Sequence, residues 1–127
     1  MGENADTRLH ALRGAITVER NDADEILAAT RELMSRLMER NQLGPEQMVS
    51  CIFTATTDLT AQFPAVAARD LGLDRVPLLC TQEIDVPGAL ERVIRVLIHY
   101  YADNGHQPQH VYLRDARALR TDLESAQ

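Results

Sequence analysis

Apolar and polar positions first alternate along the chain and then repeat with the period of a helix. Between Leu9 and Glu19, Ile16 and Val18 alternate with polar neighbours, which predicts a strand. The polar residues 1–8 before it are expected to be frayed. Asp22, with Glu25 three residues later, predicts a capping box at the start of a long helix that ends at Gly44-Pro45. Its apolar stripe is Ile26, Leu27, Leu33, Met34, Leu37 and Met38.

The middle of the chain predicts two strands around a second, short helix. Met48–Thr57 is apolar and β-branched on both alternating faces, as in a strand that is buried on both sides. Asp58 is a candidate N-cap for a helix that runs to Leu71 and ends at Gly72. Val76–Cys80 predicts a third short strand.

One C-terminal segment fits both a helix and a strand. Leu90–Tyr101 has an apolar stripe at helical spacing, which slightly favours a helix, yet it is rich in β-branched and aromatic residues. Residues 85–88 before it read Asp-Val-Pro-Gly, a turn signal. Asp103–Gln109 predicts a polar loop and His110–Leu113 a short strand, and residues 115–127 are expected to form a mobile, arginine-rich tail.

Together these elements predict an α+β fold: a mixed five-stranded sheet, if Leu90–Tyr101 is extended, with one long and one short helix. We expect one domain over residues 1–127, because no repeat or linker interrupts the pattern. Two helices are too few to cover both faces of such a sheet. Since an exposed apolar face would aggregate, we expect another copy of the chain to cover it in a closed symmetric oligomer.

Composition narrows the class of protein further. The chain is 45% hydrophobic and carries a net charge of −6, which argues against nucleic-acid binding or membrane binding through a generally basic surface. No apolar run is long enough to span a membrane, and residues 1–8 lack the apolar segment of a secretory signal. Cys51 and Cys80 are too few for a disulfide framework, so a cytoplasmic location is expected.

Several catalytic chemistries lack the residues they need. All 13 basic residues are arginines, which excludes a Schiff-base lysine and a Walker-type lysine. No glycine-rich phosphate loop follows a predicted strand, so no nucleotide cofactor is expected. A metal pair from His106 and His110 would need a helix that Gly105 and Pro108 interrupt. Cys80 lacks the local signature of a nucleophile that pairs with a histidine, whether His10, His99, His106 or His110.

Two arginines stand in an apolar, strand-like context. Arg13 lies inside the first predicted strand, and Arg95 lies in the most apolar stretch of the chain. Arginines are seldom buried unless they are paired or bind a ligand. A structural salt bridge of Arg95 to Glu83 or Asp85 is one interpretation. A clamp for a carboxylate ligand is the other, because guanidinium groups match carboxylates in bidentate geometry.

Several motifs recur in one order along the chain: Leu12-Arg13-Gly14-Ala15-Ile16-Thr17-Val18-Glu19-Arg20, Phe63-Pro64-Ala65 with Arg69, Val76-Pro77, Cys80-Thr81-Gln82-Glu83-Ile84-Asp85-Val86, Ile94-Arg95-Val96, His110-Val111-Tyr112-Leu113 and Leu119-Arg120. In this order and spacing they resemble the monofunctional AroH-class chorismate mutases. The similarity runs from about Leu9 to Asp122, and it depends on the motifs together, since each alone is weak.

The resemblance implies a pseudo-α/β-barrel homotrimer with active sites at the subunit interfaces. It implies an isomerase that converts chorismate to prephenate, without a cofactor, in the biosynthesis of phenylalanine and tyrosine. It also implies that Leu90–Tyr101 is a strand rather than a helix. Two alternatives stay open: a noncatalytic carboxylate-binding or regulatory trimer of the same architecture, and a related-looking trimer that acts as an imine deaminase.

Carried over residue by residue, the resemblance names a substrate site. Arg95, Glu83 and Arg13 would be its catalytic residues. Phe63 and Arg69 would form the neighbouring subunit's side of the pocket, while Arg120 would close it from the tail. The other substrate contacts would be Leu79, Cys80, Thr81, Gln82 and Tyr112.

The resemblance also assigns roles to these residues. Arg95 would face the ether oxygen of the substrate, Arg13 and Tyr112 would hold a carboxylate, and Glu83 would accept a hydrogen bond from the ring hydroxyl. Two positions depart from the family pattern: Val66 replaces a frequent lysine and Leu79 a frequent threonine. We expect these changes to affect affinity more than chemistry.

Overall fold

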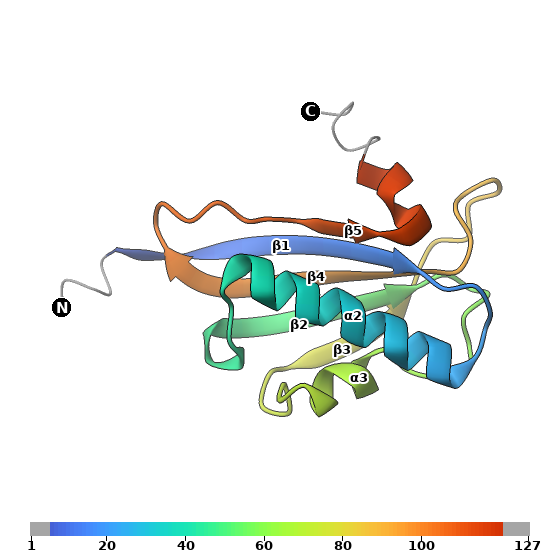
Figure 1. Cartoon of the computed structure of the whole chain (residues 1–127), viewed down its shortest axis with the longest axis horizontal. Coiled ribbons are helices and arrows are strands. Elements are labelled where there is room, and N and C mark those ends of the chain that lie inside the picture. The colour runs from blue at the N-terminus through green and yellow to red at the C-terminus, as the bar shows by residue number, and fades with distance from the viewer. Residues whose placement is uncertain (1–5, 121–127) are drawn as a thin grey trace.

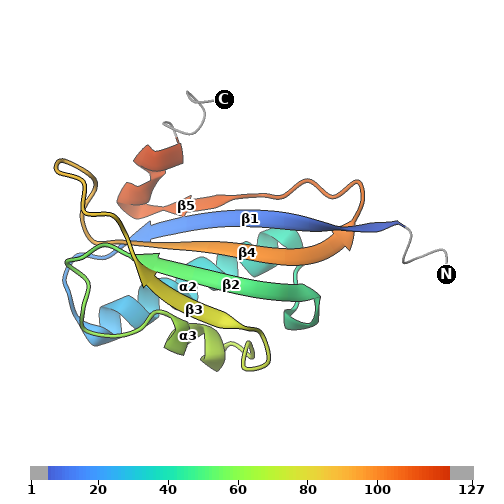
Figure 2. The ribbon, with the colours of Figure 1, turned by 180° about the vertical axis from the view of Figure 1, so that it is seen from behind.

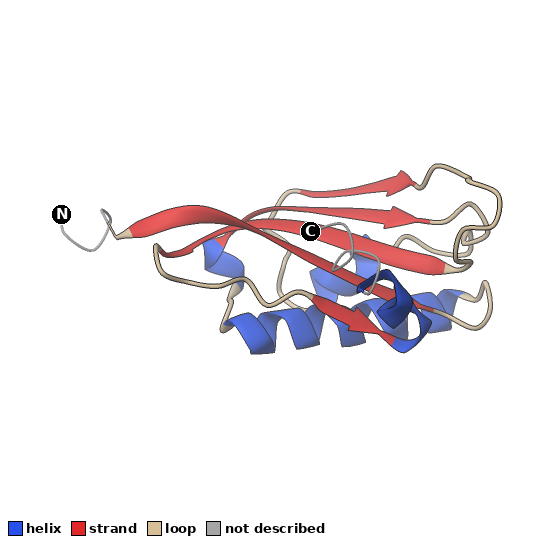
Figure 3. Cartoon of the chain, turned by 90° about the horizontal axis from the view of Figure 1, so that it is seen from above, coloured by secondary structure: helices blue, strands red, loops and turns tan. Residues whose placement is uncertain are grey.

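The computed structural model describes residues 6–120, which form one five-stranded sheet with two helices packed against one of its faces (Figures 1 and 3). The strand order is β3-β2-β4-β1-β5. The strands are β1 Thr7–Thr17, β2 Met48–Ala55, β3 Leu78–Gln82, β4 Val93–Asp103 and β5 Val111–Leu113. The helices are α2 Ala23–Asn41 and α3 Ala65–Asp70, with 3₁₀ turns η1 Pro45–Gln47 and η2 Arg114–Ala116.

The sheet is mixed, as predicted, and β4 is its central strand. This strand pairs antiparallel with both β1 and β2, while the outer pairs β1/β5 and β2/β3 are parallel. The ambiguous segment is therefore a strand, as the family resemblance implied, and its helical periodicity was misleading. A strand with neighbours on both sides satisfies its backbone groups through pairing, and its β-branched residues suit that environment.

Helix α2 follows the predicted pattern closely. The Asp22 carboxylate accepts a hydrogen bond from the Glu25 backbone N–H at 3.0 Å, whereas the Glu25 carboxylate pairs with Arg20 at 2.7 Å rather than completing the capping box. The helix ends at Asn41, where Gln42 adopts a left-handed conformation, slightly before the expected Gly44-Pro45. Of its predicted apolar stripe, Ile26, Leu33, Met34 and Leu37 are buried in the core and Met38 packs against it, whereas Leu27 is not part of that cluster.

Gly14 in β1 allows α2 to approach the sheet closely. A Cβ atom at this position would lie 2.8 Å from Leu37 Cδ1 and 3.1 Å from Leu33 Cδ1. The core forms in this contact layer, between the helices and the facing side chains of the sheet. Its largest fully buried members on the strands are Leu12, Ile16, Phe53, Ile94, Ile98 and Tyr100.

Neither α2 nor α3 covers the opposite face of the sheet, as Figure 2 shows from behind; within residues 6–120, the helical elements contact it only through the short turns after β5, near Ala15 and Val93. It carries exposed apolar side chains, with exposed fractions of 47% for Leu9, 43% for Val49, 58% for Leu79 and 52% for Tyr101. The prediction that two helices leave one face uncovered is therefore confirmed. Strand β2 is consequently buried on one face only, which corrects the expectation for Met48–Thr57.

Several predicted boundaries shift. Thr7 and Arg8, expected in the frayed start, pair with Asp103 and Ala102 at the beginning of β1, whereas residues 1–5 lie outside the described part. Strand β3 begins at Leu78, two residues later than expected. The predicted turn is present, with Gly88 at φ 83°.

Helix α3 starts later than predicted. Its N-cap is Pro64, and Asp58 caps nothing; the Asp58 carboxylate accepts instead from Thr56 Oγ1 and from the Arg92 backbone. The predicted end is correct, since Leu71 is the C-cap and Gly72 follows at φ 93°.

The first residues of the predicted C-terminal tail form regular secondary structure. Residues 114–116 form η2 and residues 117–120 are helical, with Ala116 fully buried. The remaining residues of the expected tail, 121–127, lie outside the described part. Among residues 6–120, no helix combines the length and the apolar character needed to cross a bilayer.

Candidate active site

A pocket of about 250 Å³ opens on the uncovered face of the sheet. Strands β1, β2, β4 and β5 contribute to it, together with Glu83, which directly follows β3. Two arginines, one carboxylate, one tyrosine and one threonine supply its polar side-chain groups, and the remainder is apolar or backbone. Its lining residues are Arg13, Gly14, Ala15, Ile52, Thr54, Glu83, Arg95, Val96, Leu97 and Tyr112.

Strand register brings these residues together from distant parts of the sequence. Arg95 lies opposite Ala15 on one side and Thr54 on the other, and Ala15 pairs in turn with Tyr112. One row across four strands therefore places these side chains on the same face. In the next row, Arg13 lies opposite Leu97.

Glu83 holds the central arginine. Its Oε2 lies 3.3 Å from Arg95 Nε and also accepts a hydrogen bond from Thr54 Oγ1. Of the two salt bridges considered for Arg95, the structure contains the one to Glu83. Arg95 Nε is buried and makes no hydrogen bond of good geometry within residues 6–120, while 41% of the Arg95 side chain remains exposed. Glu83 thus holds the Nε side of the Arg95 guanidinium group, and the outer guanidinium nitrogens remain accessible.

Three guanidinium groups act electrostatically on Tyr112. Burial raises the pKa of Tyr112, and the positive charges of Arg13, Arg95 and Arg120 oppose that shift. Arg120 directly follows Leu119, which packs with Tyr112 against the same small cluster, and its charge therefore acts on this phenol. The site is therefore a locally positive pocket on a chain whose net charge is −6.

A partly buried histidine supports the backbone of Arg13. His110 Nδ1 accepts a hydrogen bond from the Arg13 backbone N–H at 3.0 Å. Burial lowers the pKa of His110, and the charge of Arg13 lowers it further. The neutral imidazole is the form that accepts this bond. The other histidines bond elsewhere: His10 to the Asp103 carbonyl, His99 to Ser50 and His106 to Tyr100.

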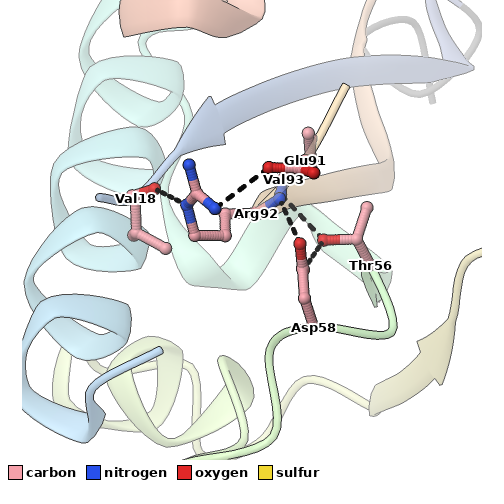
Figure 4. A network of polar contacts seen from close by, with 6 residues as sticks. All are labelled: Val18, Thr56, Asp58, Glu91, Arg92 and Val93. Carbon is pink, nitrogen blue, oxygen red and sulfur yellow. Dashed lines mark hydrogen bonds and ion pairs between the residues drawn. The ribbon is translucent and has the colours of Figure 1, made fainter. Parts of the chain in front are cut away.

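A polar network fixes the start of β4, two residues before Arg95 (Figure 4). Arg92 has a left-handed backbone, φ 52°, which is unfavourable for a residue with a Cβ atom. Its backbone N–H donates to Asp58 at 3.0 Å, and its Nε donates to the Val18 carbonyl at 3.2 Å. Thr56 Oγ1 accepts from the Val93 backbone N–H at 3.0 Å. The ends of β1, β2 and β4 are thereby tied together.

The other predicted site residues lie apart from this pocket within one chain. Phe63, 68% exposed, lines a second pocket of about 360 Å³ beside β3, together with Cys80, Thr81 and Gln82. Arg69 lies exposed on α3, and Leu79 projects from the edge of the uncovered face. The structure therefore divides the predicted residues into two groups.

Sequence reasoning missed several lining residues, namely Ile52, Thr54 and Leu97. Ile52 and Leu97 resemble ordinary strand residues in the sequence, so nothing marks them as part of a site. Only strand pairing places Thr54 beside Glu83 and Leu97 beside Arg13. His110 was considered for its imidazole chemistry, but its observed contact is with a backbone N–H.

Comparison with known proteins gives consistent matches over nearly the whole chain. The family model described as chorismate mutase type I matches residues 9–123. A chorismate mutase AroH from Thermus thermophilus is 50% identical over 121 residues, covering 94% of this chain and 99% of the relative. One from Bacillus subtilis (strain 168) is 44% identical over 117 residues, covering 91% and 92%. A solved chorismate mutase structure from Clostridium thermocellum superposes with a TM-score of 0.79 at 45% identity, covering 86% of this chain and 98% of that one.

Proposed function

The chain belongs to the chorismate mutase type I family, and we propose that it performs this isomerisation in the pocket between Arg13, Arg95 and Tyr112. It is an enzyme of aromatic amino-acid biosynthesis, which converts chorismate to prephenate. Family membership favours this over a noncatalytic trimer. The single observation that carries the assignment of the site is the Arg95 side chain, anchored by Glu83 and open toward the pocket.

The reaction suits a site without a nucleophile. Chorismate rearranges by a pericyclic shift, in which a carbon–oxygen ether bond breaks while a carbon–carbon bond forms within one molecule. The protein can hold the flexible dianion in its compact reactive conformer, and it can stabilise the negative charge that develops on the ether oxygen. Arginines and a fixed hydrogen-bond acceptor are sufficient for both tasks.

Arg95 is the residue that we assign to the ether oxygen. Its Nε is held beside Glu83, so the outer nitrogens are oriented before the substrate arrives. Charge appears on the ether oxygen only as the bond stretches. A donor aimed at that oxygen therefore stabilises the transition state more than the bound substrate, which is the condition for a faster chemical step.

The remaining polar groups bind and shape the substrate. Arg13 and Tyr112 hold one carboxylate, and Arg120 closes the positive side of the pocket. Glu83 accepts a hydrogen bond from the ring hydroxyl while it orients Arg95. These contacts are mainly ground-state binding, which selects the reactive conformer.

We further propose that the chain is a homotrimer in which each site lies between two copies. Exposed Leu9, Val49, Leu79 and Tyr101 on the uncovered sheet face support burial against another copy. The neighbouring copy would supply Phe63, Arg69 and the segment from Leu79 to Gln82, which lie outside the pocket of their own chain. In the trimer the strands and helices would form a pseudo-α/β barrel.

Two departures from the family pattern would then lie on that neighbouring side. Val66 provides no ammonium group and Leu79 provides no hydroxyl, so we expect weaker substrate binding rather than slower chemistry. The unpaired thiols of Cys51 and Cys80 are consistent with a reducing compartment, and the cytoplasmic location stays a prediction.

The test of the site follows loss of chorismate absorbance with purified wild-type chain, Arg95→Ala and Arg36→Ala. Arg36 is an exposed arginine on α2 and serves as the matched control. Losing one preorganised donor costs about 3–4 kcal/mol of barrier, so kcat of Arg95→Ala should fall at least a hundredfold or so. Arg36→Ala should retain wild-type kinetics. A wild-type kcat in Arg95→Ala would remove Arg95 from the mechanism.

A second experiment tests whether each active site takes residues from two copies of the chain. Arg95→Ala and Arg69→Ala chains, each first assayed alone and each expected to lose most activity, are unfolded together and refolded as mixed trimers. If each site uses Arg95 of one copy and Arg69 of the next, about one quarter of the sites regain both arginines on random mixing. Recovery of activity in the mixture supports the interfacial site. No recovery, with trimers present by sedimentation, contradicts it.

A further inference from the structure

The chain turns sharply at Arg114, where it leaves edge strand β5 and passes onto the uncovered face. Arg114 has a left-handed backbone, φ 56°, although it is not glycine. Such a conformation is unfavourable for a residue with a Cβ atom and persists where surrounding contacts hold it. The contacts that hold Arg114 therefore help to set the direction of residues 115–120.

Two partners hold the Arg114 side chain. Its Nη1 donates to the Thr17 carbonyl at 3.1 Å, and its Nη2 pairs with Glu32 Oε1 at 3.0 Å. Thr17 is the last residue of β1, and Glu32 lies on α2. The next residue reinforces the turn, since the Asp115 backbone N–H donates to Thr17 Oγ1 at 3.1 Å.

The turn at Arg114 directs the C-terminal helical residues onto the uncovered face. Ala116 is fully buried against Ala15 and Val93, in a small cluster separate from the main core, and Tyr112 and Leu119 pack against this cluster. Ala15 and Tyr112 also line the pocket, and the charge of Arg120 acts on Tyr112. The direction set at Arg114 therefore determines where Arg120 lies.

We propose that Arg114 is a positioning residue: held by Glu32 and Thr17, it keeps the C-terminal helical turns on the sheet so that Arg120 is placed beside the pocket. This inference rests on the proposed function and adds a role for a residue outside the pocket. The Arg114 and Glu32 side chains are 42% and 40% exposed, so their ion pair adds little to overall stability. Its effect falls on the placement of Arg120 and hence on substrate binding.

The test measures steady-state kinetics of Arg114→Ala and Glu32→Gln beside the wild-type chain. We expect KM for chorismate to rise about three- to tenfold in Arg114→Ala, and less in Glu32→Gln, with kcat nearly unchanged. Arg114→Lys, which retains the charge, should recover part of the loss. Arg31→Ala is the control, because it removes another exposed ion pair of α2, with Asp70, on the side of α3.

A double-mutant cycle separates positioning from general weakening. If Arg114 acts through Arg120, Arg114→Ala should raise KM in the wild-type background but not in the Arg120→Ala background. Equal rises in both backgrounds would overturn the proposal, as would an unchanged KM in both Arg114→Ala and Glu32→Gln or an equal rise in Arg31→Ala. If Arg114→Ala does not fold, Glu32→Gln still tests the proposal, because the Glu32 side chain is partly exposed and its substitution should not unfold the chain. Absence of turnover in the wild-type chain would overturn the proposed function and this inference with it. If the wild-type chain turns over chorismate normally, a negative result with the variants overturns only the role of Arg114.

Discussion

The two faces of the sheet are built from the same strands but have opposite chemistry. On the helix-covered face, Ile94, Val96 and Ile98 of β4 are buried in the core. On the other face the intervening residues are Arg95, Leu97 and His99, and all three are partly exposed. One alternating segment thus contributes one set of side chains to the core and the other to the uncovered face, where Arg95 and Leu97 line the pocket.

This contrast shows how a small α+β chain can stabilise itself and still present a charged site. The covered face excludes water and contains most of the buried apolar surface. The uncovered face tolerates Arg13 and Arg95 because their outer nitrogens reach solvent or ligand. Stability and function are therefore expected to respond to different residues, even where those residues are neighbours in the sequence.

The largest effect should come from the covered face. Phe53→Ala removes a fully buried ring and should lower the free energy of unfolding by about 3–5 kcal/mol. Ile52→Ala, the adjacent residue on the uncovered face, should cost less than half as much at low protein concentration. Denaturant unfolding over a range of protein concentrations measures both losses. Equal losses at the lowest concentration would contradict the difference between the faces, while a growing loss for Ile52→Ala would measure cover by another copy.

An intermediate effect is expected on the uncovered face. Arg13→Ala should raise KM for chorismate about ten- to a hundredfold, as for loss of a charged hydrogen bond, and should lower kcat less. Arg8→Ala, an exposed arginine of the same strand, is the matched control. Kinetic assays and denaturation of both variants separate binding from folding. A larger change in kcat than in KM would reassign Arg13 to the chemical step.

The smallest expected effect is a pH dependence of stability that arises from His110. Burial lowers the pKa of His110 below its ordinary value of 6.5, so the neutral ring is favoured in the folded chain. The unfolded chain binds the proton more readily, so this contribution to stability is full above about pH 6.5 and is lost as the pH falls through the lowered pKa. Unfolding free energies of the wild-type chain and His110→Gln, measured between about pH 5 and pH 7.5, test this.

The slope with pH should be smaller in His110→Gln. Burial also lowers the pKa of His106, so part of the slope should remain in that variant. Identical slopes in the two proteins would show that His110 does not contribute. Loss of the bond from the Arg13 backbone N–H on protonation should also weaken substrate binding at the acidic end of the range.

Local patterns allowed much of the secondary structure to be predicted. The Asp22 cap and the apolar stripe located α2, and the alternation around Ile16 located β1. Asp58 misled the prediction, because an aspartate before a helix usually caps it. In the structure this carboxylate binds the backbone of Arg92, whose left-handed conformation has no sequence signal.

The candidate site was predictable only in part. Arg13 and Arg95 stood out because charged residues are unusual in apolar strands, and the family resemblance supplied Glu83 and Tyr112; the pocket contains all four. Thr54, Ile52 and Leu97 were not predictable, since their place depends on pairing between strands far apart in the sequence. Phe63 and Arg69 were predicted for a neighbouring copy, and they lie outside this pocket in their own chain.

Residue order alone was enough for helix α2, for the alternating faces of the strands and for the family to which the chain belongs. These features arise from interactions over a few residues, such as capping, side-chain periodicity and turn chemistry. Tertiary structure decided that the strand within Leu90–Tyr101 is the central one, that Arg95 pairs with Glu83 rather than Asp85, and that the C-terminal turns fold onto the uncovered face. Those outcomes depend on strand register and on packing between distant segments, whose free energies exist only once the sheet has formed.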